Sequence, residues 1–289
     1  MGRLYKTIIS AIRPNIDLIL WLFGFKFATV VALFLPLNVL VMETWSASDF
    51  PNRLLKGDYL FVLFETINAD PGGFRQYAVF FIMLLGIIWL AYQFLIAGVY
   101  GKYLSRRDED DMQFNIFYYS GSYFLSFFKL AIFTVFISAV FIIAIFIFSA
   151  IFTSFSTGGG GDFVVYIWAA IMIIIWLMLI SFFLNCCRAS VALNRTTGVR
   201  DTFKAVWNLW KRNKLLLMES VVMLYAIAII VIILYFVVAN VMGSLDAPML
   251  IVYLFLIFRQ LISALLSLSR FLFVSGSVEF MKIGFEKED

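Results

Sequence analysis

The fold of this chain follows from the stretch Val199-Arg-Asp-Thr-Phe-Lys-Ala-Val-Trp-Asn-Leu-Trp-Lys-Arg-Asn-Lys214. On a helix, its aromatic and aliphatic residues fall on one side and its basic and polar residues on the other. A helix with two such faces typically lies flat in the headgroup layer of a membrane. A long apolar run follows directly. The apolar side holds Val199, Phe203, Val206, Trp207 and Trp210, and the polar side holds Arg200, Lys204, Asn208 and Lys211.

The composition predicts an all-α integral membrane protein. Of the 289 residues, 63% are hydrophobic and 14% are charged, whereas soluble domains have about 45–50% apolar and about 25% charged residues. The apolar residues also come in runs of the length that a membrane-spanning helix needs, about 20 residues. On such a protein the small net charge of +4 indicates topology signals and contacts with anionic lipid, and no nucleic-acid partner is expected.

The sequence lacks residues on which several kinds of catalysis and metal binding usually depend. The chain has no histidine, which excludes histidine-based acid–base catalysis and the usual histidine metal sites, so no cofactor or metal is expected. Cys186 and Cys187 are neighbours, and such pairs are typical of small buried apolar side chains. The acidic run from Asp108 to Asp111 lacks the spacing and glycine of a calcium loop and predicts a solvated loop before a helix.

Three repeats organise the predicted fold. Each consists of an amphipathic interfacial helix, which ends in a lysine, and a hairpin of two spans. The resulting six transmembrane helices form three hairpins within a single membrane domain, residues 1–289. The spans are expected at about 27–42, 78–100, 130–153, 163–187, 215–242 and 249–275. The pseudo-repeats are 1–101, 113–188 and 198–275, and a charged C-terminal tail, 276–289, follows.

The charge distribution predicts the orientation. Most of the 22 Lys and Arg residues lie in the segments that carry the flat helices or follow the last span. By the positive-inside rule both termini and all three flat helices are therefore expected on the cytoplasmic side. The residues expected to contact lipid at this interface are Lys26, Lys129, Trp207, Trp210, Lys211 and Lys214.

Arg259 is the charge placed deepest in a predicted span. On the sixth span it shares one stripe with Ser263, Ser267 and Arg270. A charge at this depth usually faces a bundle interior or cavity, which indicates an anion or headgroup contact, or a transport pathway. The alternative is an arginine that snorkels to the interface, beside helix packing through the two serines. The sequence leaves both interpretations open.

Two further polar groups lie in predicted spans. Glu219 is expected at a depth similar to that of Arg270, which predicts a structural ion pair, with a proton-coupled carboxylate as the alternative. On the fourth span, Asn185 and Arg188 make a second polar stripe. Tyr92, Gln93 and Tyr100 give the second span some polar character.

The stretch from Gly198 to Asn213, with its glycine, its tryptophans and its basic end entering a span, resembles a segment in the membrane domain of bacterial glycerophosphoryl diester phosphodiesterases. It is also similar to related uncharacterised six-helix membrane protein families. The resemblance implies a prokaryotic cytoplasmic (inner) membrane and a helper role beside lipid-related or envelope functions. The 289 residues contain no soluble phosphodiesterase segment, so that activity is not expected of this chain.

The expected function is that of a non-enzymatic, multi-pass subunit or scaffold of a membrane complex. Its expected partners are membrane lipids and other membrane protein subunits or further copies of itself. The alternative is a transporter or channel for a small or anionic solute that uses the polar stripes of the fifth and sixth spans. An intramembrane enzyme with Glu219 as its acid ranks third.

Overall fold

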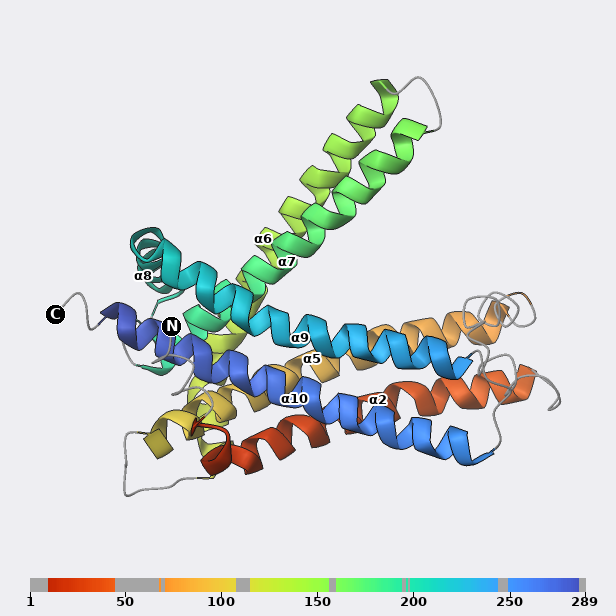
Figure 1. The fold of residues 1–289 in the computed structure, drawn as a ribbon, viewed down its shortest axis with the longest axis horizontal. Helices are drawn as coiled ribbons and strands as arrows, with labels where there is room; N and C mark the ends of the chain where they lie inside the picture. The colour runs from red at the N-terminus through yellow and green to blue at the C-terminus, as the bar shows by residue number, and fades with distance from the viewer. Residues whose placement is uncertain are drawn as a thin grey trace. The chain divides into compact units, whose positions relative to one another are not determined.

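The computed structural model describes residues 10–44, 68, 71–107, 115–155, 160–193, 196, 198–243 and 249–285. These residues form helices and no strands, which confirms the predicted all-α class. The chain begins with a short 3-10 turn, η1, at Arg13–Asn15. The α-helices are α2 (Ile16–Thr44), α5 (Pro71–Arg107), α6 (Ile116–Phe155), α7 (Gly160–Ala192), α8 (Val199–Arg212), α9 (Lys214–Gly243) and α10 (Met249–Phe285) (Figure 1).

Within the described part of the chain, five helices are long and apolar enough to cross a membrane, so the chain is a multi-pass membrane protein. The predicted fifth span is helical within α9, but its described apolar stretch, Ser220–Leu234, is shorter. The number of six spans therefore stays a prediction. The five segments are Arg13–Leu33, Pro71–Arg106, Ile116–Thr153, Val164–Ala192 and Gln260–Phe285.

The chain divides into two compact units, and three helices contribute to both of them. Unit 1 comprises Met1–Asn15, Gln93–Tyr225 and Leu272–Asp289, and unit 2 comprises Ile16–Tyr92 and Ala226–Phe271. The division cuts α5, α9 and α10. Each unit is described below by itself.

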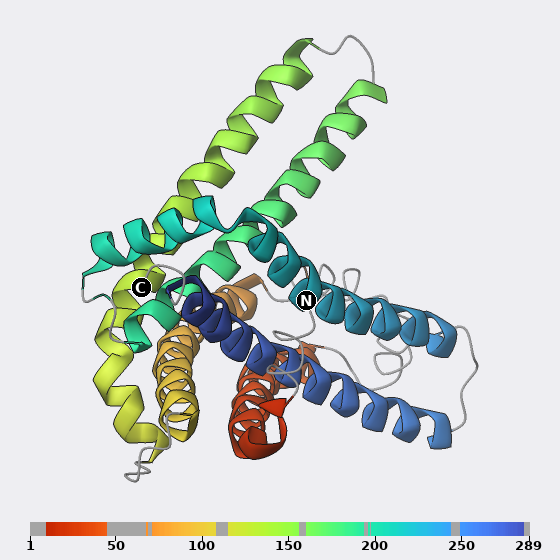
Figure 2. The same cartoon turned by 60° about the vertical axis from the view of Figure 1, so that its left-hand side comes forward.

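In unit 1, α6 and α7 run antiparallel and side by side (Figures 1 and 2). Large rings join them: Phe141 stacks on Trp176 with 3.8 Å between ring centroids. Toward the end of the two helices formed by Phe155 and Gly160, which we call the far end, the ring centroids of Phe148 and Trp168 lie 5.6 Å apart. We call these two helices the α6–α7 pair. Because only a narrow strip of each helix faces the other, most of the pair's large apolar side chains stay exposed.

α5 and α6 approach each other closely because α5 carries two glycines at their contact. A Cβ atom at Gly98 would lie 2.6 Å from the carbonyl oxygen of Ile116, and one at Gly101 would lie 2.5 Å from Cβ of Tyr119. Both distances are shorter than real contacts allow, so neither position has room for a side chain. Small residues that let backbones approach are typical of helix packing in membranes.

In unit 2, the described side chains of α2 and of the first part of α5 make direct contacts. Phe25 packs against Tyr92 with 6.1 Å between ring centroids. The Tyr77 hydroxyl donates a hydrogen bond to the carbonyl oxygen of Leu33 at 3.2 Å. The outer sides of these helices remain apolar and exposed, as at Ile82 and Met83.

Of the three predicted flat helices, the third is a separate helix in the structure, whereas the expected ends of the other two are wrong. Asn213 ends α8 with φ −113° and ψ 47°, and α9 begins at the next residue. In contrast, α2 continues through Lys26 and α6 continues through Lys129. Lysine itself favours helix, and the residues beside Lys26 and Lys129 are phenylalanine and leucine, whereas α8 ends at an asparagine, a poorer helix former.

The charged tail expected at 276–289 is also not observed as such. α10 continues to Phe285, and Val278, Phe280 and Met281 are fully buried in unit 1. This segment is buried despite its few charges because its apolar residues pack against other helices of unit 1. For example, the ring centroid of Phe280 lies 5.9 Å from that of Phe182 on α7. Similarly, α5 extends to Arg107 beyond the expected span end at residue 100.

Candidate functional site

Unit 1 contains a buried group of polar side chains around Arg188, which we call the Arg188 cluster. Its members come from α5, α6, α7 and α10, and each of them is at most 5% exposed. The cluster consists of Gln93, Tyr100, Phe127, Asn185, Arg188 and Ser277.

The described contacts of the Arg188 guanidinium include two amide oxygens and an aromatic ring. Its Nη2 donates a hydrogen bond to Oε1 of Gln93 at 2.6 Å, and its Nη1 donates to Oδ1 of Asn185 at 3.3 Å. The guanidinium carbon lies 5.8 Å from the ring centroid of Phe127, in the range of a cation–π contact. Amide oxygens and a π face are suitable partners for a cation that is only 3% exposed.

The Tyr100 hydroxyl links the cluster to α10. It lies 2.9 Å from Oγ of Ser277 and donates to the carbonyl oxygen of Asn185 at 3.1 Å. The ring of Tyr100 meets Phe127 edge-on, with 5.4 Å between centroids. The cluster therefore connects three helices by side-chain hydrogen bonds and the fourth, α6, by the ring of Phe127.

This arrangement is suited to holding helices in register. Its hydrogen bonds satisfy several buried polar atoms, although Nε of Arg188 has no hydrogen-bond partner among the described residues. Buried hydrogen-bond networks rigidify the structure that contains them. None of the cluster contacts described above positions a nucleophile beside a base, the geometry that acyl or group transfer requires. Among the described residues, no group of three or more His, Cys, Asp or Glu is placed to hold a metal ion.

The sequence-predicted stripe of Asn185 and Arg188 lies inside this cluster. Gln93 and Tyr100, which gave the second span its polar character, meet it from α5. Ser277 was missed because it lay in the expected tail. The available signal was the triplet Ser275-Gly276-Ser277, since small residues in an apolar helix indicate close packing.

The structure describes the side chains of only part of the polar stripe predicted on the sixth span. Ser267 is buried and donates its hydroxyl to the carbonyl oxygen of Ser263 at 2.9 Å. The side chains of Arg259 and Glu219 lie outside the described ones. The ion pair between Glu219 and Arg270, and the transport pathway through Arg259, therefore stay predictions.

Arg270 is exposed on α10, and its described electrostatic neighbour is a cation. Lys26 of α2 is half-buried and lies close enough to Arg270 for the two positive charges to interact. Both residues belong to unit 2. Lys129, on α6 in unit 1, is exposed.

The apolar face of α8 packs on α6 and α7. The Phe203 ring meets Phe133 of α6 at 4.9 Å and Phe183 of α7 at 5.0 Å between centroids. Trp210 lies 4.9 Å from Phe183 and 5.9 Å from Phe182. Trp210 therefore packs on α7, and its expected lipid contact stays a prediction.

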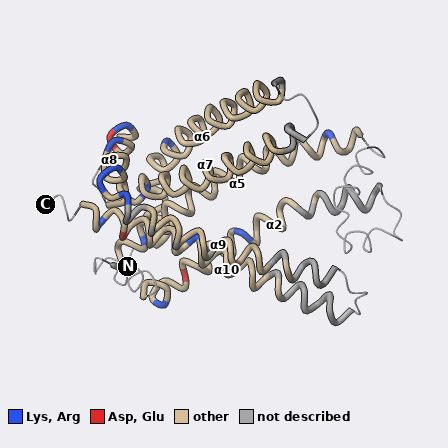
Figure 3. Tube along the Cα trace, turned by 45° about the horizontal axis from the view of Figure 1, so that its top comes forward, with Lys and Arg blue, Asp and Glu red and all other residues tan. Residues whose placement is uncertain are grey.

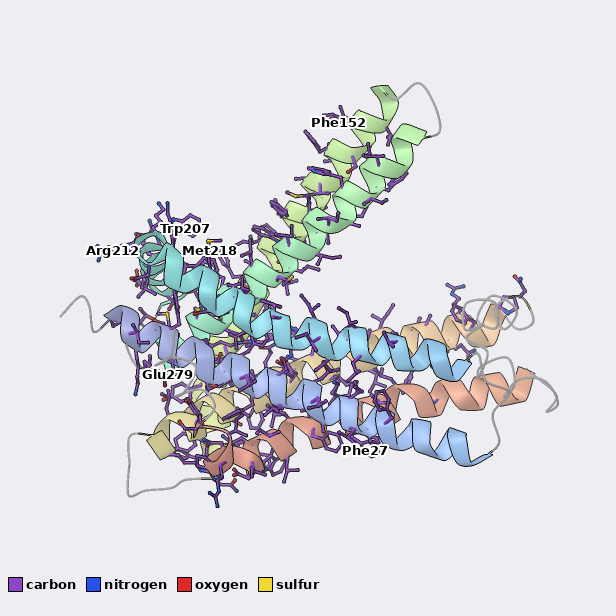
Figure 4. All side chains as sticks on the ribbon, in the orientation of Figure 1. Phe27, Phe152, Trp207, Arg212, Met218 and Glu279 are labelled. Carbon is purple, nitrogen blue, oxygen red and sulfur yellow. The ribbon has the colours of Figure 1, made fainter. Side chains whose placement is uncertain are left out.

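Trp207 lies on the opposite side of α8 from the one expected. It is 52% exposed, whereas Thr202, Val206 and Leu209 are buried. The buried face is centred on these three residues, and successive residues of a helix are separated by about 100°, so Trp207 points outward. It projects from α8 as Arg212 does (Figure 4).

The outward face of α8 is basic. Figure 3 shows Lys and Arg gathered on this helix. Its exposed residues, together with the first residue of α9, are Arg200, Asp201, Lys204, Trp207, Asn208, Lys211, Arg212 and Lys214.

A chain of hydroxyl groups fixes the start of α8. Oγ1 of Thr202 donates to the carbonyl oxygen of Gly198 and to Oγ1 of Thr196, both at 2.8 Å. Thr196 in turn lies 3.0 Å from Oγ of Ser190 at the end of α7. Sequence patterns did not identify these residues, which orient α8 against α7.

Sequence patterns also did not single out Glu279, which is labelled on α10 in Figure 4. It is a further buried polar residue and is 5% exposed.

Comparison with protein-family models, curated proteins and solved structures finds no match for this chain. The resemblance to the membrane domain of bacterial glycerophosphoryl diester phosphodiesterases therefore stays an expectation.

Proposed function

We propose that the protein is a non-enzymatic, multi-pass subunit or scaffold of a membrane complex, and that the α6–α7 pair carries its contact surface. The observation that supports this most is the contrast between the two ends of the pair. Buried polar side chains gather where Arg188 and Asn185 lie, while the rest of the pair displays large apolar side chains on its outer sides.

The length of the pair fits a bilayer. α8 crosses the pair at the level of Phe133 and Phe183. Beyond that level, residues 134–155 and 160–182 give each helix about 22 residues, or ~33 Å at 1.5 Å per residue. This is close to the hydrocarbon thickness of about 30 Å. The two stretches contain a single charged residue, Asp162, at the far end.

With the far part of the pair in the membrane, α8 lies at one membrane surface and the Arg188 cluster lies on the same side. The distribution of Lys and Arg supports a cytoplasmic location of this side, with six spans and both termini cytoplasmic. The resemblance of Gly198–Asn213 supports a prokaryotic inner membrane. Phospholipid and neighbouring subunits, or further copies of the chain, are the proposed partners.

Site-specific photo-crosslinking in native membranes tests the scaffold role. Phe136, Ile143 and Ile147 are all more than half exposed, and their spacing of seven and four residues places them on one stripe of α6. A photoreactive residue at each of these positions is expected to give the same discrete protein adduct. Ile145, which is 6% exposed, is the matched control and is expected to give none.

Adducts with lipid alone at all three stripe positions would contradict the proposal. The same holds for a purified protein that stays strictly monomeric and without a partner in mild detergent.

A further inference from the structure

The two faces of α8 have different partners available to them. The inner face is occupied by Phe133, Phe182 and Phe183 of the α6–α7 pair, and Leu209 lies against Gly284 of α10, where a Cβ atom would collide with it. Because this face already packs on protein, α8 cannot bind a membrane by inserting it. The outward face is the one that remains accessible to another molecule.

The outward face combines positive charge with an aromatic ring. Lys204 and Lys211 are exposed there, together with Arg200 and Arg212, and Asp201 is the only acidic residue of the helix. Nζ of Lys211 lies 5.3 Å from the ring centroid of Trp207. Trp residues are enriched at membrane–water interfaces, where the ring lies at headgroup level.

The position of α8 agrees with this composition. It crosses the α6–α7 pair about 22 residues from the far end, the distance at which the hydrocarbon core ends and the headgroups begin. Cations held at this level meet the negative surface potential of anionic lipids. Charge complementarity therefore selects an anionic headgroup as the occupant.

We propose that the outward face of α8 is a binding site for anionic phospholipid headgroups, with Lys204 and Lys211 contacting the phosphate and Trp207 lying at the headgroup level. This inference rests on the membrane placement proposed above, but not on the scaffold role. It differs from insertion of an amphipathic helix, since binding at this face depends on charge and not on buried apolar area.

The test is native mass spectrometry of the full-length protein in mild detergent, titrated separately with phosphatidylglycerol and phosphatidylcholine of the same acyl chains. Wild type is expected to bind phosphatidylglycerol about tenfold more tightly than phosphatidylcholine. The variant K204Q/K211Q is expected to lose that preference, since each cation near the surface contributes up to about fivefold. Higher ionic strength is expected to reduce the wild-type preference, because salt screens exposed charges.

Two controls separate charge at α8 from other effects. K204R/K211R keeps both charges and is expected to keep the preference. R75Q removes an exposed cation from α5 and is expected to leave it unchanged. Equal binding of both lipids by wild type, or an undiminished preference in K204Q/K211Q, would overturn the inference.

A competition arm identifies what occupies this face. Glycerol 3-phosphate that competes as strongly as phosphatidylglycerol would point to a free anion and would also overturn the inference. Each of these results leaves the photo-crosslinking at Phe136, Ile143 and Ile147 unaffected, so failure of the lipid site and failure of the scaffold role are distinguishable.

Discussion

Nη2 of Arg188, on α7, donates a 2.6 Å hydrogen bond to Oε1 of Gln93, on α5, and both side chains are at most 3% exposed. The two residues are 95 positions apart in the chain. Their contact therefore records how α5 and α7 are aligned, and it is shorter than the other hydrogen bonds described for the Arg188 cluster. Its removal is expected to loosen unit 1.

The first prediction concerns Gln93. Gln93→Ala removes one acceptor of the Arg188 guanidinium, which keeps its contact with Asn185, and the loss of one hydrogen bond to a charged group costs about 1.5–3 kcal/mol. We expect a corresponding fall in the free energy of unfolding, measured by SDS titration followed by circular dichroism. Gln76→Ala, at an exposed position of the same helix, is the control and is expected to change it little. Equal stability of the two variants would show that the cluster does not support unit 1.

The second prediction concerns the contact of α5 with α6. Gly98→Ala places a Cβ atom 2.6 Å from the carbonyl oxygen of Ile116, so the two backbones must move apart. Overpacking of this kind costs about 1–3 kcal/mol. Gly86→Ala, where nothing lies within 4 Å, is expected to be neutral or to stabilise by up to about 1 kcal/mol. Thermal unfolding in detergent compares the two, and a stabilising Gly98→Ala would contradict the observed packing.

The third prediction separates the two tryptophans of α8. Trp210→Ala removes a ring packed against Phe182 and Phe183, and truncation of a packed aromatic residue costs about 3 kcal/mol. Trp207→Ala, at a 52% exposed position, is expected to leave the unfolding midpoint within the error of wild type. If Trp207→Ala proves the more destabilising of the two, the face of α8 that carries Trp207 is the buried one, and the orientation of α8 is wrong.

The fourth prediction concerns the cysteines. Cys186 and Cys187 are fully buried in α7. We therefore expect both thiols to stay unlabelled by maleimide in the folded protein and to react once SDS unfolds it. Rapid labelling of the folded protein, followed by mass spectrometry, would contradict the burial of this part of α7.

Sequence patterns identified the helical membrane class and, to within two residues, the ends of α8, because composition, run length and amphipathic periodicity are local properties. They also pointed to Arg188 and Asn185 as polar residues in an apolar helix. The partner of Arg188, Gln93, could not be assigned, since the relative register of α5 and α7 depends on packing that no single helix encodes. Similarly, helical periodicity alone placed Trp207 on the apolar side of α8. In the structure, the face that packs against the α6–α7 pair is centred nearer Thr202, so Trp207 points outward.

The two missed boundaries have one physical cause. Helix ends were expected at Lys26 and Lys129 because a charge precedes an apolar run at each of them. A lysine does not stop a helix, and its long side chain can reach the interface from within one. The burial of Val278 and Phe280 was missed for the opposite reason, since nearby charges indicated a solvated tail.

The most direct test of the membrane placement is a depth profile along α6 by electron paramagnetic resonance of nitroxide labels in lipid nanodiscs. Collision rates with oxygen and with a water-soluble nickel chelate report membrane depth. We expect labels at Ser122 and Leu125 to be accessible to the nickel chelate, and labels at Phe136, Ile143 and Ile147 to be accessible to oxygen alone. Strong nickel accessibility at the last three positions would contradict the placement of the α6–α7 pair in the membrane.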